Sequence, residues 1–472
     1  MQKNDQTSAN ETHKIKKAYY PNVIGKKVAF LTLGCKVNSY ETEAMQQLFL
    51  EAGATLADFE ELSDIYVVNT CTVTNIADRK SRQMLHKAKK NNPNSVVIAV
   101  GCYVQAAKEA LLADDTVDLV IGNNKKNEIV FLADEYYESQ NNYAVIDIDT
   151  DYEYEELAIA AVTEKTRAYI KIQDGCNQFC SYCIIPYARG RIRSRSEEEI
   201  KKEVMRLVEN GYQEIVLTGI HLSSYGLEAL SVKEQAELLP ENGISPLMTL
   251  ILSLSEINGL SRIRLSSLEP RIITEEFVKT LANKSKLCPH FHLSLQSGSK
   301  ETLIRMNRKY TPDDYYNRCE IIRKYYKNPA ITTDIIVGFP GETEEEFEKT
   351  IAFLEKVQFS QMHIFKYSKR KGTKAESMPN QVPEQMKTKR SEILFESEKK
   401  MRMKYLDYFI GSKDVVLTEE ETAIGDTIYM IGHTTRYVKV AIPAQDLKSN
   451  ELVNVNITGY LNDDVLLSEI ID

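Results

Sequence analysis

The sequence has no tryptophan, only seven histidines, and no apolar run long enough to span a membrane. Its first residues, Met1 to Lys17, are polar and charged and lack the apolar core of a signal peptide. These absences predict a cytoplasmic protein without a membrane segment. Because disulfide bonds are rare in the cytoplasm, cysteines that occur in groups are expected to bind metal or to do chemistry.

The chain is 472 residues long, so about three domains are expected rather than one core. Its composition, 43% hydrophobic and 27% charged, is that of a globular protein. The net charge of −9 does not suggest binding to nucleic acid, but the charge is uneven. Residues 134–156 hold nine acidic residues and no Lys or Arg, residues 361–410 carry a net charge of +6, and residues 411–472 carry −7.

Residues 25–138 are predicted to form an α/β domain with a parallel sheet. Short apolar runs, typical of buried parallel strands, alternate there with segments of helical periodicity. The runs are Val28–Leu33, Ile65–Val68, Val96–Val100 and Val117–Ile121, and helices are expected at Tyr40–Leu50, Ile76–Lys90 and Gln105–Leu112. The acidic residues 139–161 are expected to form a linker or an exposed edge.

Residues 162–392 are predicted to form an incomplete (β/α)6 barrel, because six strands alternate with helices. The expected strands are Ala168–Ile172, Ile215–Thr218, Ile263–Leu265, His290–Leu295, Ile331–Val337 and Met362–Phe365. Residues 227–246 are interpreted as an inserted surface excursion. A charged helix is expected from Pro383 to Phe409. Residues 393–411 are expected to connect the central domain, as helix or linker, to the last domain at residues 412–472. The alternating apolar and polar residues of this last part predict a small antiparallel barrel.

Three cysteines directly follow the first strand of the expected barrel, with the spacing Cys176-x3-Cys180-x2-Cys183. A [4Fe–4S] cluster normally takes four cysteine ligands, so three thiolates leave one iron open. An open iron can bind the amino and carboxylate groups of S-adenosylmethionine, and an electron from the cluster can then cleave its sulfonium to a carbon radical. The alternative is a structural zinc site, which needs a fourth ligand. The candidates for that ligand are Cys288, His290 and His292.

Three further cysteines, Cys35, Cys71 and Cys102, each stand just past the end of a predicted parallel strand. The carboxyl ends of parallel strands share one edge of the sheet, so these thiols are expected to converge there. A single cysteine at such a place is often only a small buried hydrophobic residue. The repeated placement instead favours a second cluster with an open iron. Cys288 and Cys319 belong to neither trio and are expected to pack in the core.

The central trio resembles the radical S-adenosylmethionine superfamily. Tyr182 matches the family's aromatic position beside the cofactor's adenine, and Leu217-Thr218-Gly219 resembles the motif that meets its amino group. Residues 293–298, which include Gln296, and residues 334–343 resemble the later barrel strands. Each segment alone is also compatible with ordinary turns, so the resemblance rests on their order. It implies that Tyr182, Thr218, Gly219 and Gln296 contact the cofactor.

The segments Leu33–Glu41, Asn69–Thr74 and Val100–Cys102 resemble the N-terminal domain of methylthiotransferases, and the resemblance covers nearly the whole chain from about Lys26. It implies that the cluster of the N-terminal trio carries the sulfur that is methylated and transferred. Residues 412–472 resemble the TRAM module, an RNA-binding β-barrel. Their net charge of −7 departs from what a phosphate-binding surface should show.

Three bacterial branches of that family modify isopentenyladenosine in tRNA, threonylcarbamoyladenosine in tRNA, or an aspartate of a ribosomal protein. Residues 34–38, 71–82 and 180–190 resemble the threonylcarbamoyladenosine branch. The resemblance implies that two S-adenosylmethionine molecules are used per turnover, one as methyl donor and one as radical source, and that C2 of the adenosine at position 37 receives the methylthio group. The expected partners are tRNA, an electron donor and a sulfur donor. A non-catalytic iron–sulfur protein that binds RNA is the alternative from another class.

Contacts with RNA are expected from arginines beside the central trio, because the guanidinium group binds phosphate well. The alternative is a solvated loop or pairing with Glu197–Glu199. A second candidate is the basic stretch of Lys366, Lys369, Arg370 and Lys371, and the C-terminal module offers three more side chains. His363 and Tyr367 are interpreted as core residues rather than substrate contacts. The RNA-binding candidates are Arg189, Arg191, Arg193, Arg195, Lys366, Lys369, Arg370, Lys371, His433, Arg436 and Lys439.

Overall fold

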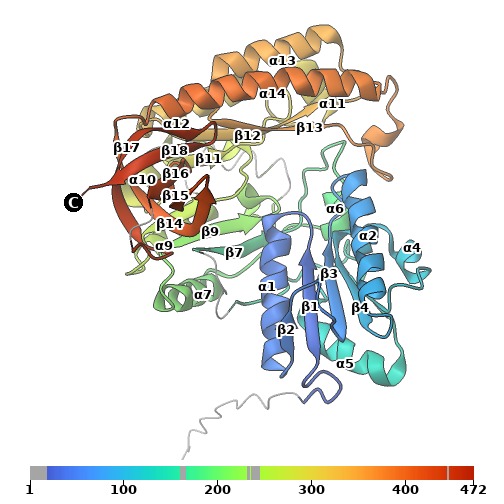
Figure 1. The fold of residues 1–472 in the computed structure, drawn as a ribbon. Coiled ribbons are helices and arrows are strands. Elements are labelled where there is room, and N and C mark those ends of the chain that lie inside the picture. The colour runs from blue at the N-terminus through green and yellow to red at the C-terminus, as the bar shows by residue number, and fades with distance from the viewer. Residues whose placement is uncertain (1–18, 160–165, 231–233, 235–244, 444–445, 472) are drawn as a thin grey trace, which may run out of the picture.

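The computed structural model describes residues 19–159, 166–230, 234, 245–443 and 446–471. Three β-sheet units follow one another along the chain: an N-terminal sheet, a central barrel and a small C-terminal barrel (Figure 1). None of the helices in these ranges combines the length and apolar character needed to cross a membrane.

The N-terminal unit is a parallel sheet with the strand order β2-β1-β3-β4-β5-β6. The central strands β3 and β4 are buried along their whole length, because α1 and α5 cover one face of the sheet and α2, α3 and α4 the other. The strands are β1 (Lys27–Thr32), β2 (Thr55–Ala57), β3 (Ile65–Thr70), β4 (Val96–Gly101), β5 (Leu119–Ile121) and β6 (Tyr143–Ala144). The helices are α1 (Lys36–Glu51), α2 (Asn75–Asn91), α3 (Cys102–Ala106), α4 (Lys108–Leu112) and α5 (Ile129–Ser139).

The central unit contains six parallel strands in two sheets, which isolated bridges such as Leu268–Leu293 join into an incomplete barrel. Its strands are β7 (Arg167–Asp174), β9 (Glu214–Gly219), β10 (Arg262–Leu265), β11 (His290–His292), β12 (Ala330–Val337) and β13 (Gln361–Lys366), and β8 (Arg193–Ser194) pairs antiparallel with β7. The helices are α6 (Ile185–Arg189), α7 (Glu197–Glu209), α9 (Pro246–Ser255), α10 (Glu275–Lys284), α11 (Lys300–Arg305), α12 (Pro312–Tyr325) and α13 (Glu344–Val357).

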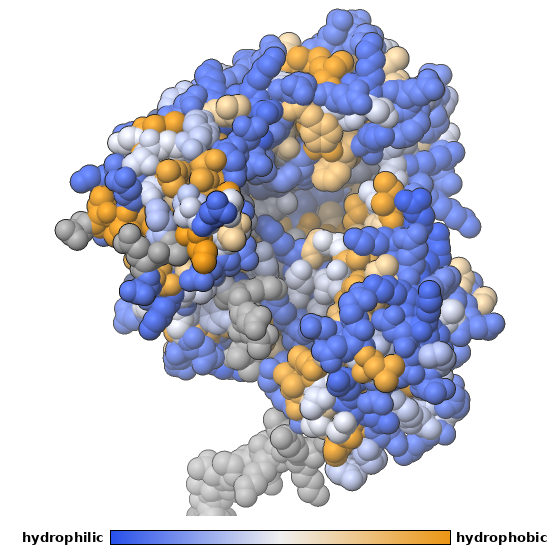
Figure 2. Space-filling view, viewed as in Figure 1, coloured by the Kyte–Doolittle hydropathy of each residue, from blue (hydrophilic) through white to orange (hydrophobic). Residues whose placement is uncertain are grey.

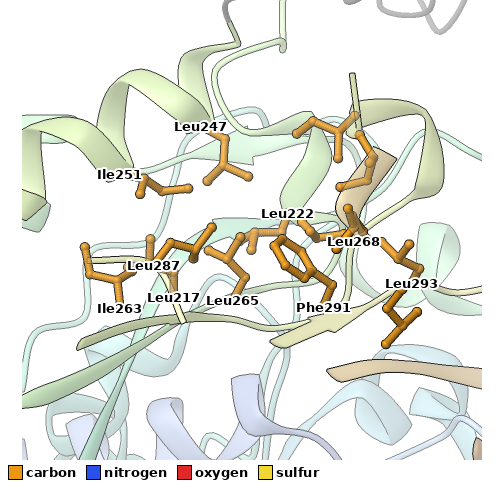
Figure 3. Close-up of a cluster of buried hydrophobic side chains, with 14 of the residues drawn as sticks. Leu217, Leu222, Leu247, Ile251, Ile263, Leu265, Leu268, Leu287, Phe291 and Leu293 are labelled. Atoms are coloured by element: carbon orange, nitrogen blue, oxygen red, sulfur yellow. The ribbon is translucent and has the colours of Figure 1, made fainter. Parts of the chain in front are cut away.

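The outer face of the barrel strands forms the main hydrophobic core. Alternate residues of β9, β10 and β11 point toward helix α9 and pack with Leu247 and Ile251 (Figure 3). The residues between them point into the barrel, and on β10 and β11 these are polar: Arg262, Arg264, His290 and His292. The inner face of these two strands is therefore polar, in contrast to their apolar outer face.

Helix α14 (Glu384–Asp407) lies along β13 and leads to the C-terminal barrel (Figure 1). Its closed order is β14-β15-β16-β18-β17, with strands β14 (Lys413–Ile424), β15 (Thr427–Thr434), β16 (Lys439–Pro443), β17 (Leu452–Asn462) and β18 (Val465–Ile470). Arg262 and Arg264 donate hydrogen bonds to its backbone, including one of 2.7 Å from Arg262 Nη2 to the carbonyl of Val415. Two arginines of the central barrel thus fix the C-terminal barrel in place.

The predicted fold class is confirmed, with several differences in detail. The acidic segment is not a plain linker, because β6 adds a strand to the N-terminal sheet and Leu157 and Ile159 enter the main core. The expected helix Gln105–Leu112 is divided into α3 and α4, the C-terminal barrel includes one parallel pair, β16–β18, and α14 spans the predicted domain boundary at residue 392. Most of the expected insertion 227–246, and residues 160–161 of the segment, lie outside the described residues.

Candidate active site

The central cysteine trio lies on the loop that leaves the C-terminal end of β7. Gly175 begins this loop with a φ of 70°, and a Cβ there would come within 1.8 Å of the Arg191 carbonyl oxygen. Burial, together with the smaller effect of the neighbouring Cys180, raises the pKa of the Cys183 thiol to about 12. Burial and the same neighbour also raise the pKa of Cys176. The three thiols therefore face one another, and none is in a disulfide.

Arg308, which follows α11, was not predicted to belong to this site. Its Nη1 donates to Cys180 Sγ at 3.2 Å, its Nη2 to the Ser294 carbonyl at 3.2 Å, and its Nε to the Tyr310 hydroxyl at 2.9 Å. A fixed positive charge beside a thiol favours the thiolate, which is the form that binds metal. In the sequence Asn307-Arg308-Lys309 nothing distinguishes this arginine from an ordinary surface residue.

A pocket of about 150 Å³ opens beside the central trio. Tyr182 and Gln296 line it, as the resemblance implies, whereas Thr218 and Gly219 do not. Thr218 is buried, and Gly219 packs against the side chain and backbone of Gln173. The complete lining is Cys176, Gln178, Cys180, Tyr182, Cys183, Ile185, Ile220, His221, Ser267, Leu268, Glu269, Ser294, Gln296 and Arg308.

His221 is another residue of this pocket that sequence patterns did not indicate. Burial lowers its pKa to about 4, so the ring is neutral at physiological pH. Its Nδ1 lies 2.6 Å from Ser224 Oγ, while its buried Nε2 has no hydrogen-bond partner within the described part of the chain. The pocket thus holds one polar atom that is free to meet a ligand.

The N-terminal trio converges at the carboxyl edge of the first sheet. Cys71 and Cys102 directly follow β3 and β4, and Cys35 comes three residues after the end of β1; the three strands are neighbours in the sheet. Burial, with smaller effects of the nearby Cys102 and Cys35, raises the pKa of Cys71 to about 11. A Cβ on Gly34 would lie 2.9 Å from Cys71 Sγ, so the glycine leaves room for this approach.

Arg189 connects the two trios. It follows Cys183 on α6, and its Nε donates to Cys102 Sγ at 3.1 Å. Its Nη1 donates to Glu41 Oε1 at 2.8 Å and to Asp174 Oδ2 at 3.0 Å, and the whole side chain is buried. A single guanidinium therefore touches the N-terminal trio and two buried carboxylates at once.

The structure contradicts the prediction of a basic RNA-binding strip next to the central trio. Arg189, Arg193 and Arg195 are at most 2% exposed. Arg193 donates to the Arg189 carbonyl at 2.8 Å, and Arg195 pairs with Glu203 and Glu156. Arg189 pairs with Glu41, 148 residues away, and Arg195 with Glu156 on the preceding segment, so the spacing of the arginines alone did not reveal their burial. Only Arg191 of this set is partly exposed, 3.7 Å from Asp149.

The second basic stretch contains both exposed and buried side chains. Lys366, Lys369 and Lys371 are exposed, whereas Arg370 is buried and its Nη2 donates at 2.7 Å to both Asp78 Oδ2 and Thr72 Oγ1. Arg370 therefore holds the loop after Cys71 against the central unit. In the C-terminal barrel, Arg436 pairs with Asp414 and His433 with Glu419, and Lys439 is half-buried.

The predictions for the remaining side chains have mixed outcomes. Cys288, Cys319 and Tyr367 are buried as expected, but His363 is exposed, so its assignment to the core is wrong.

Within the described ranges, no three His, Cys, Asp or Glu side chains are arranged as the ligands of one metal ion. The thiols of a cubane cluster bind different iron atoms and need not be so close. Converging thiols, two cysteine-bound guanidiniums and a pocket fit an iron–sulfur cluster at each trio.

Comparisons with known proteins agree with this geometry. Residues 170–354 match the family model described as "Radical SAM superfamily", and residues 27–122 match "Uncharacterized protein family UPF0004". A solved radical S-adenosylmethionine methyltransferase from Kitasatospora setae, TsrM, has a TM-score of 0.53 at 14% identity, covering 73% of this chain and 75% of that one. At this identity the likeness concerns the fold alone.

Two curated relatives span almost the whole chain. The threonylcarbamoyladenosine tRNA methylthiotransferase MtaB of Bacillus subtilis is 42% identical, covering 92% of this chain and 94% of the relative. A tRNA-2-methylthio-N(6)-dimethylallyladenosine synthase of Acetivibrio thermocellus is 35% identical, covering 92% and 89%. This protein therefore belongs to the radical S-adenosylmethionine methylthiotransferase family.

Proposed function

We propose that this protein attaches a methylthio group to C2 of N6-threonylcarbamoyladenosine at position 37 of tRNA, beside the anticodon, giving 2-methylthio-N6-threonylcarbamoyladenosine. The observation that carries the proposal is the convergence of three thiols in each of two trios, with Arg189, which follows Cys183 in the chain, bound to Cys102. The substrate comes from the relatives: those named for threonylcarbamoyladenosine reach 42% identity, and those named for dimethylallyladenosine reach 35%.

Two [4Fe–4S] clusters are proposed, one held by Cys35, Cys71 and Cys102 and the other by Cys176, Cys180 and Cys183. When bound, the second cluster would supply an electron for the reductive cleavage of S-adenosylmethionine, and the first would hold the sulfur to be methylated and transferred. The target is an aromatic C–H bond, from which no ordinary side-chain base removes a proton at neutral pH. Radical chemistry is therefore needed, and two S-adenosylmethionine molecules are consumed per turnover.

The chain's own residues position these groups. Arg308 and Arg189 each donate a hydrogen bond to a cysteine sulfur, which fixes the orientation of Cys180 and of Cys102. Tyr182, Gln296 and the neutral His221 line the pocket proposed for S-adenosylmethionine. Thr218 and Gly219, behind this lining, would support the loop that carries His221 rather than touch the cofactor.

The tRNA is proposed to approach the hollow between the N-terminal unit, the C-terminal barrel and the layer formed by β13 and α14 (Figure 2). The exposed Lys366, Lys369 and Lys371 and the partly exposed Arg191 are the proposed phosphate contacts. An electron donor and a sulfur donor complete the set of partners, and the cytoplasm, where tRNA is modified, is the proposed location.

Anaerobic reconstitution tests the clusters, and nucleoside analysis tests the substrate. The wild type should bind about eight iron atoms per chain, and the triple alanine variant of either trio about four. Under reduction the wild type should release deoxyadenosine from S-adenosylmethionine, whereas a non-catalytic iron–sulfur protein would release none. Mass spectrometry of tRNA from a deletion strain should show loss of 2-methylthio-N6-threonylcarbamoyladenosine. Its persistence, where no other enzyme makes it, would contradict the substrate; loss of the dimethylallyl nucleoside or of a modified ribosomal aspartate would favour another branch.

A further inference from the structure

One cation beside the N-terminal trio has no counter-ion within the described ranges. Lys36 directly follows Cys35 and begins α1, and its side chain is exposed. Its Nζ lies 6.0 Å from the ring centroid of Tyr169 on β7. Among the described residues, no carboxylate forms an ion pair with it. The nearest comparable cations differ in this respect, since Arg167 pairs with Glu419 and Arg264 with Glu214.

Two histidines of the central barrel lie next to each other. His292 on β11 and His363 on β13 have ring centroids 5.7 Å apart. His292 is held in place by Thr332 Oγ1 at 2.9 Å and Asp334 Oδ2 at 3.1 Å, whereas His363 is exposed. Burial lowers the pKa of His363, Asp334 opposes this effect, and His292 and the charge of Lys36 lower it further. The charge of Lys36 therefore reaches His363.

The charges in this space favour an anionic ligand. Asp334 is the carboxylate that faces the two histidines, and it is already bonded to His292. An ammonium without a partner, with an exposed imidazole near it, is suited to one carboxylate, because a charge-assisted hydrogen bond is stronger than a neutral one. An apolar substituent would gain nothing from either group.

The chemistry of the proposed substrate places an anion near this point. The threonylcarbamoyl group on N6 ends in a free carboxylate, while a dimethylallyl group has no charge. In adenine only N1 separates C6 from C2, so a substituent on N6 begins close to the carbon that would face the Cys35 cluster. Lys36 is the residue next to that cysteine.

We propose that Lys36, with His363 and His292, forms the subsite that binds the threonyl carboxylate of the modified adenosine and excludes the dimethylallyl substrate. The inference rests on the proposed function and deepens it. Lys36 forms the ion pair, His363 adds a hydrogen bond, and His292, fixed by Asp334 and Thr332, holds the position of His363. The same cation would also suit a backbone phosphate, and the experiment distinguishes the two sources.

The test measures binding of two anticodon stem-loop RNAs, one with N6-threonylcarbamoyladenosine and one with adenosine at position 37, to the reconstituted protein. Lys36→Met should weaken binding of the modified RNA at least about tenfold and leave the unmodified RNA unaffected. Lys36→Arg should restore most of the affinity. Lys90→Met, an exposed lysine at the far end of α2, is the matched control and should change neither. His363→Ala should cause a smaller loss, again for the modified RNA alone.

Iron content and the visible spectrum of each variant show whether the cluster beside Cys35 is intact, and only variants with wild-type values are compared. An equal loss for both RNAs would assign Lys36 to a phosphate and overturn the proposal, as would unchanged binding. If the wild type itself does not distinguish the two RNAs and modifies neither, the proposed substrate is wrong. If the wild type prefers the modified RNA and the Lys36→Met variant keeps this preference, the proposed subsite is wrong but the proposed substrate is not.

Discussion

Glu41 is the residue whose neutralisation should damage this protein most without touching a cysteine. It is completely buried, and its oxygens lie 2.8 Å from each of Lys126 Nζ, Lys171 Nζ and Arg189 Nη1. Burial alone would raise the pKa of Glu41, but the charges of Arg189, Lys126 and Lys171 hold it well below its usual range. The carboxylate is therefore ionised in the folded protein.

Glu41→Gln keeps the shape of the side chain and removes the charge. Asp174 still pairs with Lys171 and Arg189, but Lys126, which is fully buried, loses its one direct carboxylate partner among the described residues. Breaking a buried ion pair in this way costs about 3–5 kcal/mol. We expect the variant's free energy of unfolding to fall by that amount.

The assay is urea denaturation under anaerobic conditions, followed by far-ultraviolet circular dichroism because the chain has no tryptophan. Glu51→Gln, exposed on the same helix, is the control and should change stability by less than about 0.5 kcal/mol. Adding Lys126→Met to Glu41→Gln removes the orphaned cation and should recover part of the loss. A Glu41→Gln protein within about 1 kcal/mol of the wild type would refute the argument that this network depends on charge balance.

Three further predictions concern the ion pairs and hydrogen bonds described for the two cysteine trios. Arg370→Gln removes the hydrogen bonds to Thr72 and Asp78, so amide hydrogen exchange in residues 72–78 should accelerate at least about tenfold, and unchanged exchange would contradict the clamp. Arg308→Gln removes the guanidinium from Cys180 Sγ, so a chelator should extract iron several-fold faster than from the wild type, with Arg308→Lys intermediate; equal rates would argue against a role in holding the cluster. Because the pKa values of Glu41 and Asp174 are lowered by folding, their contribution to stability should be complete above about pH 5 and lost on further acidification, and Glu41→Gln should show a shallower acid dependence.

The sequence predicted most of the strands and both cysteine trios, because these depend on local patterns. A buried parallel strand is a continuous apolar run, and a cysteine after such a run must lie at the carboxyl edge. The strands β14 and β15 were missed because they carry charged and polar residues on an exposed face, as in Glu419–Glu421. The side chains that complete the site, such as Arg308 and His221, come from loops that only the folded barrel brings to the cysteines.

The arginines after Cys183 show a different limit. Their sequence spacing suggested an exposed basic strip, but whether an arginine is exposed depends on where its partners lie. Glu41, which pairs with Arg189, precedes it by 148 residues, and no local pattern connects them. The run of arginines therefore identified a basic segment correctly, but the predicted exposure of its side chains was wrong.

The segment that joins the N-terminal sheet to the barrel is bound to both. Tyr143–Ala144 extends the sheet, Glu155 is buried, and Leu157 and Ile159 are part of the barrel's core. Residues 143–159 of this connection are thus anchored in both units, so the sheet that carries one cysteine trio and the barrel that carries the other are mechanically coupled.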